Sequence, residues 1–336
     1  MKWKRVNSMK DVTVVIPVYN SKKYIKRCID SVLIQTMKNY KILLINDGST
    51  DNSLKIIEDY KNKYPNIISI VNQENMGVAK TRNKAIELAT TKYIMFIDND
   101  DYIDNDYIEE FYKNIKNTNN KVVIGGYKRT NQKDEIIEYI KLNPLNYFDR
   151  LKVTTPWARI IDRNFLIENN IRFLDNNIGE DIYFDLLINF TTNDIKVINY
   201  SGYNWFYNDF SVSNTIQKDQ KKLDIFKLLN SCYDELEKRN LIKDNYEIIE
   251  AFFFRYIIWF LYYTTKNISY SELSQIYDKL FIWLKERFPR YLKNKYVSLS
   301  NPKGEKFKDR LLYYLLKITN KFKLGKKYLY LYNKRK

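Results

Sequence analysis

Two groups of acidic residues could carry chemistry in this sequence. Three aspartates fall within positions 98–101, directly after the apolar run 93–97. Carboxylates crowded at the end of a buried strand repel one another unless a cation or a sugar hydroxyl lies among them. Glu180 and Asp181 form the second group. One group could hold a metal ion while the other supplies a base, although an acidic turn ahead of a helix capped by Asp104 explains the first group equally well.

The absence of histidine narrows the chemistry that these acids can do. Any proton acceptor is expected to be a carboxylate, and any metal ion is expected to be held by oxygen, which favours Mn²⁺ or Mg²⁺. Ser-His-Asp and Cys-His catalysis are excluded. The sequence has no Gly-x-Gly-x-x-Gly after the first predicted strand and no Walker-type phosphate loop, which argues against nicotinamide dehydrogenases and P-loop nucleotidases. Cys28 and Cys232 are expected to be reduced thiols.

Alternating strands and helices are expected to position the acids. Four apolar runs each end in a polar loop, and the first three are followed by segments of helical periodicity. This order predicts a right-handed parallel sheet whose strands all end at one edge, where open α/β sheets bind ligands. The runs are 12–18, 41–45, 67–71 and 93–97, and the polar residues expected to converge after them are Asn20, Asp47, Asn75 and 98–101.

The pattern changes in the last third of the chain. A helix is expected to begin near Glu180, and the aromatic segment 200–207 is expected to be extended. Beyond residue 215 long helical segments replace the alternating pattern, so a boundary is predicted between the domains 1–215 and 216–336. The helices expected in the second domain are 223–238, 246–264 and 271–285.

Six motifs in order resemble the signature of the family 2 glycosyltransferases of GT-A fold. Each motif alone is weak, but the ordered set is specific and covers about residues 11–213. The resemblance implies an α/β fold with a Rossmann-like, mostly parallel sheet flanked by helices, followed by a smaller helical C-terminal domain. The motifs lie at 14–20, 31–36, 46–51 and 75–83, with an Asp-x-Asp metal motif at 98–101 and a Glu-Asp motif at 179–181.

The family implies inverting transfer of a sugar from a nucleotide sugar, usually a UDP-sugar, to a hydroxyl. Asp100, together with Asp98, is then expected to hold Mn²⁺ or Mg²⁺, which would neutralise the charge that grows on the diphosphate leaving group. Asp181 matches the base of the family and is expected to take the proton of the acceptor hydroxyl. Glu180 is expected to orient the acceptor or the base.

The resemblance also places the donor nucleotide. The residues that follow the first strand are expected to lie under the base and the ribose. Asp47 is expected to accept a hydrogen bond from the uracil imide N–H, and Arg82 to lie near the base or the diphosphate. The nucleotide-sugar-binding residues expected in this way are Pro17, Tyr19, Asn20, Asp47, Arg82, Asp98 and Asn99.

The apolar patch 155–161 contributes two candidates for acceptor binding. Trp157 belongs either to the core or to the floor of the acceptor site. Arg159 either binds substrate or forms a structural ion pair with Glu180 or Asp181.

The charge of the chain indicates an anionic partner. The formal net charge is +17, and residues 301–336 contain twelve basic and two acidic residues, a net +10. A helix with Phe307 and Leu315 on one face and lysines around it suits an anionic membrane surface, and 304–336 is expected to make that contact. The alternative is a helix that packs on its domain and leaves a solvated charged face. No apolar run approaches the roughly 20 residues that span a bilayer, so the protein is expected to be cytoplasmic and peripheral on the cytoplasmic face of the plasma membrane.

These observations together predict an enzyme that extends a lipid-linked bacterial cell-surface glycan from a UDP-sugar donor, with no nucleic-acid partner. The alternative is a non-catalytic module of the same fold that binds nucleic acid or anionic lipid through its basic tail. The intact acidic motifs favour the enzyme, because a pure binding module has no use for them.

Overall fold

The computed structural model describes residues 10–208, 223–266 and 268–334, and the chain divides into two compact units, 1–208 and 209–336. The boundary predicted near residue 215 lies outside the described residues. Each unit is described below by itself.

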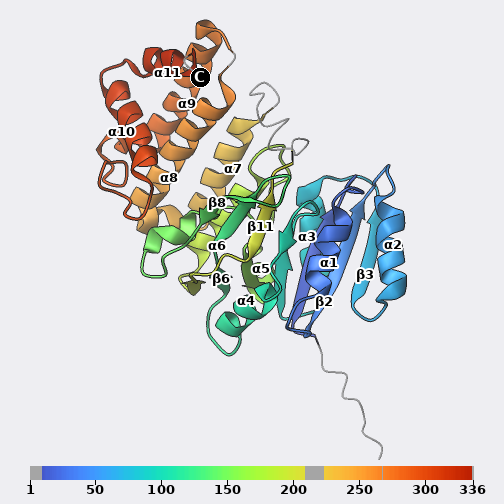
Figure 1. Ribbon diagram of the computed structural model, residues 1–336. Helices are drawn as coiled ribbons and strands as arrows, with labels where there is room; N and C mark the ends of the chain where they lie inside the picture. Colours follow the sequence, from blue (N-terminus) through green and yellow to red (C-terminus); the bar gives the residue numbers. More distant parts are fainter. Residues whose placement is uncertain (1–9, 209–222, 267, 335–336) are drawn as a thin grey trace, which may run out of the picture. The chain divides into compact units, whose positions relative to one another are not determined.

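A seven-stranded sheet forms the core of the first unit, in the order β10-β6-β9-β4-β1-β2-β3 (Figure 1). Strands β1 to β4 are mutually parallel, as their alternation with helices predicts, whereas β9 runs antiparallel to both β4 and β6. Every residue of β1 is buried, which explains why all of its residues except Pro17 are β-branched. The strands are β1 (Val12–Val18), β2 (Tyr40–Asp47), β3 (Ile68–Gln73), β4 (Tyr93–Phe96), β6 (Val122–Ile124), β9 (Arg159–Asp162) and β10 (Ile195–Val197).

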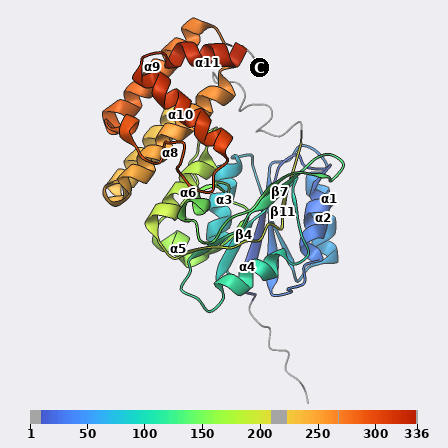
Figure 2. The same ribbon diagram turned by 60° about the vertical axis from the view of Figure 1, so that its left-hand side comes forward.

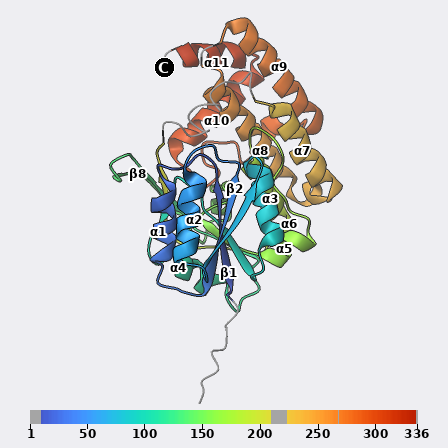
Figure 3. The same ribbon diagram turned by 90° about the vertical axis from the view of Figure 1, so that its right-hand side faces the viewer.

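Helices cover both faces of this sheet. In Figure 3, α1, α2 and α4 lie on one face, and α3, α5 and α6 on the other. Helix α1 buries Ile25, Cys28, Ile29 and Val32, spaced so that they share one helix face. The helices are α1 (Ile25–Leu33), α2 (Ser53–Lys63), α3 (Val78–Leu88), α4 (Tyr107–Ile115), α5 (Arg163–Glu168) and α6 (Glu180–Thr191), with a 3₁₀ turn η1 (Tyr147–Leu151).

The cap predicted for the helix after the acidic group is wrong. Helix α4 begins at Tyr107 and Asp106 occupies its N-cap position. The Asp104 carboxylate instead forms an ion pair with Lys128 and accepts a hydrogen bond from Asn204. Two strands of another sheet therefore engage this carboxylate.

A second sheet has four strands in the order β5-β11-β7-β8, and its first strand begins directly after the acidic residues 98–101. Its strands are β5 (Tyr102–Ile103), β7 (Tyr127–Thr130), β8 (Ile136–Ile140) and β11 (Tyr203–Phe206). Strand β11 pairs with β5 on one side and with β7 on the other, and Figure 2 shows β7 and β11 side by side. The aromatic segment predicted to be extended thus anchors the chain that leaves residues 98–101.

The second unit is helical. Helix α9 begins with a capping box in which Ser269 and Glu272 exchange hydrogen bonds. Among the described helices, none combines the length and the apolarity that crossing a bilayer requires. The elements are α7 (Ile225–Lys238), α8 (Leu241–Thr264), α9 (Tyr270–Arg287), the 3₁₀ turn η4 (Tyr291–Lys293), α10 (Phe307–Lys321) and α11 (Gly325–Lys334), so the three predicted helices are present.

Candidate active site

The loops after β1, β2 and β4 meet at one edge of the large sheet, as the parallel topology predicts. The Asn20 side-chain oxygen accepts hydrogen bonds from the backbone N–H groups of Thr50 (2.8 Å) and Asp51 (3.3 Å). The Asn99 side chain donates to the carbonyl of Pro17 at 2.8 Å. These hydrogen bonds join loops separated by up to 82 positions in the sequence into one continuous rim.

Asp47 joins the loop after β3 to the same rim. Its buried carboxylate accepts hydrogen bonds from the backbone N–H groups of Met76 and Gly77, both at 2.9 Å, and from the Gln73 side chain at 2.8 Å. Gly48 has φ +69°, and a Cβ there would lie 2.7 Å from the backbone nitrogen of Asn75, so the two loops approach too closely for a side chain. The predicted contact between Asp47 and uracil stays a prediction.

Arg82 brings the two acidic groups together. Its side chain is 5% exposed and forms ion pairs with Asp98 (2.6 Å) and Glu180 (3.3 Å). The ring of Phe173 lies 5.4 Å from the guanidinium carbon and covers the group further. The metal motif and the Glu-Asp motif therefore share one site, with a buried cation between them.

Asp181 lies beside this bridge, in the first turn of α6. The preceding Gly179 adopts the left-handed conformation, φ 69°, that lets the chain enter the helix. Burial, and secondly the charge of Glu180, raise the pKa of Asp181 to about 8, although Arg82 opposes the shift. A carboxyl group whose pKa lies near neutral pH is suited to accept a proton from a hydroxyl and to release it afterwards.

Asp101 has a structural role that the sequence did not reveal. Its buried carboxylate accepts hydrogen bonds from the Tyr203 hydroxyl (2.5 Å) and from the Phe206 backbone N–H (2.8 Å). The same hydroxyl accepts a hydrogen bond from the backbone N–H of Asp98 at 3.2 Å. Asp101 thus fastens residues 98–101, hereafter the acidic turn, to β11.

Asp98 and Asp100 are the carboxylates of the acidic turn that remain for a ligand. Burial, and secondly the charge of Asp98, raise the pKa of Asp100. Within the described residues, no group of three or more acidic or cysteine side chains is arranged to hold a metal ion. Mg²⁺ and similar ions are commonly bound by one or two carboxylates, with water and substrate phosphates completing the shell, and the two aspartates fit such a shared site.

Sequence reasoning missed Asn208 as a partner of Asp100. The Asn208 side-chain amide donates to the Asp100 carboxylate at 3.2 Å and accepts a hydrogen bond from the Tyr24 hydroxyl at 3.3 Å. No local pattern indicates this contact, because it joins segments more than 100 residues apart. Only the pairing of β11 with β5 brings Asn208 to the acidic turn.

The structure buries Trp157 and Arg159, the two candidates for acceptor binding. Trp157 is buried and stacks on Tyr203, with ring centroids 4.3 Å apart. Arg159 is fully buried and forms an ion pair with Asp185 at 2.8 Å, not with Glu180 or Asp181. Both side chains therefore pack in the core of the unit, and their contact with an acceptor stays a prediction.

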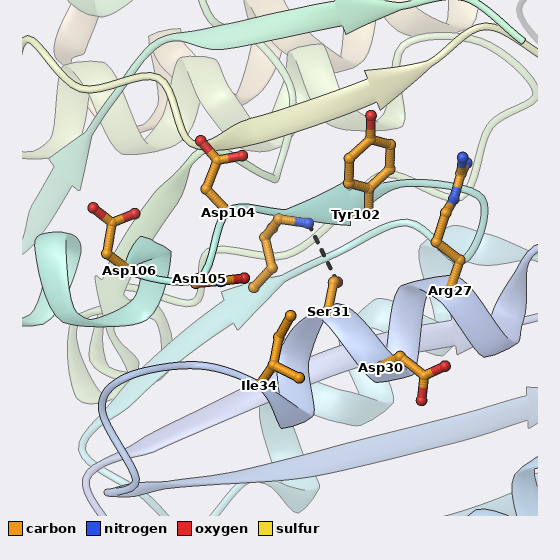
Figure 4. Close-up of a pocket in the computed structure, with 9 residues that line it drawn as sticks. Arg27, Asp30, Ser31, Ile34, Tyr102, Asp104, Asn105 and Asp106 are labelled. Carbon is orange, nitrogen blue, oxygen red and sulfur yellow. Dashed lines mark hydrogen bonds between the residues drawn. The ribbon is translucent and has the colours of Figure 1, made fainter. Parts of the chain in front are cut away.

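A groove of about 770 Å³ lies apart from this site, between α1 and the start of β5 (Figure 4). Arg27, Ile34 and Tyr102 line it together with several acids. Its acids have partners within the protein, since Asp104 pairs with Lys128 and Asp106 accepts a hydrogen bond from Tyr200. None of the motif acids at 98–101 and 180–181 lines the groove, so it is not the site that the acidic motifs form.

Comparisons with known proteins agree with this architecture. Residues 13–170 match the family described as "Glycosyl transferase family 2". The chain is 29% identical to the cholesterol galactosyltransferase of Borreliella burgdorferi, over 81% of each protein. It is 27% identical to the processive diacylglycerol β-glycosyltransferase of Mycoplasma genitalium, over 82% of this chain and 88% of the relative.

Other similarities cover less of the relative or rest on structure. Glycosyltransferase GlyA of Streptococcus pneumoniae is 29% identical over 57% of this chain, which spans only 30% of GlyA. The crystal structure of S. aureus TarS residues 1–349 in complex with UDP-GlcNAc superimposes with a TM-score of 0.61 at 18% identity, over 93% of this chain and 92% of that one. The fold, the family match and the convergence on one site of the motifs at 14–20, 46–51, 75–83, 98–101 and 179–181 lead to the same conclusion: residues 13–170 belong to the family 2 glycosyltransferases, and the chain has the GT-A fold.

Proposed function

We propose that this glycosyltransferase transfers a sugar from a UDP-sugar, with inversion and metal dependence, to a hydroxyl of a lipid-linked cell-surface glycan. The observation that carries the proposal is the pair of contacts from Arg82 to Asp98 and Glu180. They hold the carboxylates expected to bind the donor beside the carboxylates expected to act on the acceptor. A single displacement needs both sets within one site.

The chemical step assigns one role to each acid. Asp181 takes the proton of the acceptor hydroxyl, whose oxygen forms a bond to the anomeric carbon while the bond to the diphosphate breaks on the opposite face. Glu180 orients the acceptor, and its charge helps to keep the pKa of Asp181 high. Asp98 and Asp100 would hold Mn²⁺ or Mg²⁺, which when bound neutralises the charge developing on the departing UDP.

The rim of the site supplies the nucleoside contacts. Tyr19 is exposed at the end of β1 and can cover the base, with Pro17 and Asn20 beside it. Asp47 and Asn99 complete the rim by holding its loops in place. TarS, which has been crystallised with UDP and with UDP-GlcNAc, shares the fold, and this similarity supports a UDP-sugar as the donor.

A lipid hydroxyl itself is a second candidate for the acceptor. Two relatives that match over more than 80% of both chains are named for cholesterol and for diacylglycerol. Helix α10 and the turn that joins it to α11 expose Phe307, Phe322 and Leu324 on the most basic part of the chain. Such a surface suits contact with an anionic membrane, which would bring either acceptor to the enzyme on the cytoplasmic face.

The test is release of UDP from a panel of UDP-sugars, with and without Mn²⁺, using vesicles that contain either diacylglycerol, cholesterol or an undecaprenyl-linked saccharide. One donor should support turnover only with the metal ion and only with one acceptor class. Asp181→Asn should bind that donor like the wild type and lose at least about 100-fold in kcat. Full activity of this variant with saturating donor would refute the assignment of the base.

A further inference from the structure

Arg27, in the first turn of α1, contacts the acidic turn from behind. Its guanidinium donates a hydrogen bond to the carbonyl of Asp100 at 3.0 Å and forms an ion pair with Asp134 at 2.9 Å. Its carbon lies 4.5 Å from the ring centre of Tyr102 and 3.9 Å from that of Phe206. One side chain therefore joins α1, the acidic turn, β5, β11 and the turn of the β7–β8 hairpin.

The geometry suits a guanidinium and no other side chain. Its two flat faces can lie against aromatic rings while its edge donates to two acceptors in different directions. Figure 4 shows Arg27 and Tyr102 extending side by side from α1 and from β5 at one end of the groove. The Asp100 carbonyl belongs to the peptide group that joins Asp100 to Asp101. By holding this peptide group, Arg27 fixes the direction in which both side chains leave the backbone.

The N-terminal end of α1 also holds the Asp100 carboxylate in place, through Tyr24 and Asn208. Tyr24 directly precedes the helix and donates to Asn208, whose amide donates to Asp100. The Tyr24 ring packs on Phe206 with centroids 5.7 Å apart. Backbone and side chain of Asp100 are thus held from one helix terminus, by two separate routes.

We propose that Arg27 is a positioning residue that holds the acidic turn in the conformation in which Asp98 and Asp100 can bind the donor diphosphate and its metal ion. The inference rests on the proposed function for the role of the two aspartates. The competing explanation is that Arg27 only stabilises the unit by fastening the β7–β8 hairpin through Asp134. In the first explanation the important partner of Arg27 is the Asp100 carbonyl, and in the second it is Asp134.

Matched variants separate these partners. Arg27→Met keeps the aliphatic contact with the rings but removes both polar contacts. Asp134→Asn removes the ion pair and leaves the bond from Arg27 to the Asp100 carbonyl in place. Arg27→Lys keeps the charge and one donor, so it should recover part of what Arg27→Met loses.

Hydrogen exchange gives a readout that needs no substrate. Peptides covering 97–103 should exchange at least about 10-fold faster in Arg27→Met than in the wild type, while those of β1 and β2 keep their rates. Asp134→Asn should leave the exchange of 97–103 unchanged. Unchanged exchange in Arg27→Met, or equal acceleration in both variants, would overturn the inference whatever the enzyme transfers.

Ligand binding supplies the second readout. Mn²⁺-dependent UDP affinity, measured by calorimetry on the full chain, should fall about 10- to 100-fold in Arg27→Met, as for loss of a group that supports a metal ligand, and less in Arg27→Lys. Asp134→Asn should bind like the wild type. If the wild type shows no metal-dependent UDP binding, the proposed function fails, whereas wild-type binding that Arg27→Met retains in full refutes only the role of Arg27.

Discussion

At the scale of single residues, Arg82 is the centre of the site. The sequence indicates a contact with the nucleotide, but the structure shows its guanidinium between Asp98 and Glu180. In the absence of a donor this cation offsets the repulsion of the surrounding carboxylates. Under the proposed function, a metal ion and a diphosphate would bind next to Asp98, which already has a positively charged partner.

Replacing Arg82 with Met should lower the stability of the protein and shift the pH dependence of catalysis to higher pH. We expect the free energy of unfolding to fall by about 2 kcal/mol, because two partly buried carboxylates lose their counter-charge. Since Arg82 lowers the pKa of Asp181, its removal should move the acidic limb of the pH–rate profile to higher pH. Chemical denaturation and initial rates between pH 6 and 9.5 measure both effects, with Arg82→Lys as the control that keeps the charge.

The pKa of Asp181 gives a prediction for the wild-type enzyme. The base must be ionised to accept a proton, and burial raises its pKa to about 8. For the free enzyme, kcat/KM for the acceptor should therefore increase as the pH rises through about 8. A profile that is flat from pH 6 to 9 would show that another group takes the proton.

The same shift makes Asp181 costly for stability. Its pKa in the fold, about 8, lies above the ordinary 3.8, so the folded state retains its proton and loses relative stability as the pH rises from about 4 to 8. The asparagine of Asp181→Asn cannot ionise. The free energy of unfolding of this variant should therefore exceed that of the wild type by at least about 1 kcal/mol at pH 8.5. At pH 4 the two proteins should unfold at the same denaturant concentration, and an equal difference at both pH values would contradict the explanation.

At the scale of elements, helix α6 presents the Glu-Asp motif, and a buried ion pair fixes the helix. Arg159 on β9 pairs with Asp185 one turn after Asp181, and Asn189 donates to the same carboxylate at 2.9 Å. Arg159, one of the two candidates for acceptor binding, therefore supports the site through the helix that carries Asp181. The four-stranded sheet has the corresponding role for the acidic turn, which it holds through Tyr203 and Asp101.

Loss of one member of the Arg159–Asp185 ion pair should destabilise the protein more than replacement of both members by apolar residues. Asp185→Asn leaves a buried guanidinium without its counter-charge and should cost about 3–5 kcal/mol. The double variant Arg159→Met/Asp185→Leu removes both charges and should recover most of that loss. Urea unfolding of Arg159→Met, Asp185→Leu and the double variant measures the coupling, and additive losses would show that the two side chains act independently.

At the scale of the whole molecule, the basic tail forms part of the helical unit. Helices α10 and α11 contact α8 and α9, and they bury Leu316 and Leu329. Removal of 304–336 would therefore uncover core residues and confuse unfolding with loss of membrane contact. The exposed apolar side chains provide a cleaner experiment, since Phe322 is 65% exposed and Leu324 is 55% exposed.

Substitution of Phe307, Phe322 and Leu324 by serine should weaken binding to phosphatidylserine-containing vesicles at least about 10-fold, because the apolar part of the contact is lost. The melting temperature should stay within about 2 °C of the wild type, since these side chains are exposed. Vesicles of phosphatidylcholine alone are the control for charge. Undiminished binding of the triple variant to anionic vesicles would exclude this surface as the membrane contact.

The sequence by itself determined the parallel arrangement of β1 to β4 and the convergence of their loops. Periodicity and strand order are local properties, and the right-handed crossover leaves one edge at which the strands can end. It also identified both acidic groups, because their motifs are short and contiguous. The partners of those acidic groups could not be predicted from the sequence, because they lie on segments distant along the chain.

The tertiary structure alone decided which charges meet. It placed Arg82 between Asp98 and Glu180, paired Arg159 with Asp185, and fastened Asp101 to Tyr203. These contacts depend on the antiparallel insertion of β9 and on the second sheet, both of which join segments remote in sequence. Buried polar groups take whichever partner satisfies them in the folded chain, and no local pattern specifies that choice.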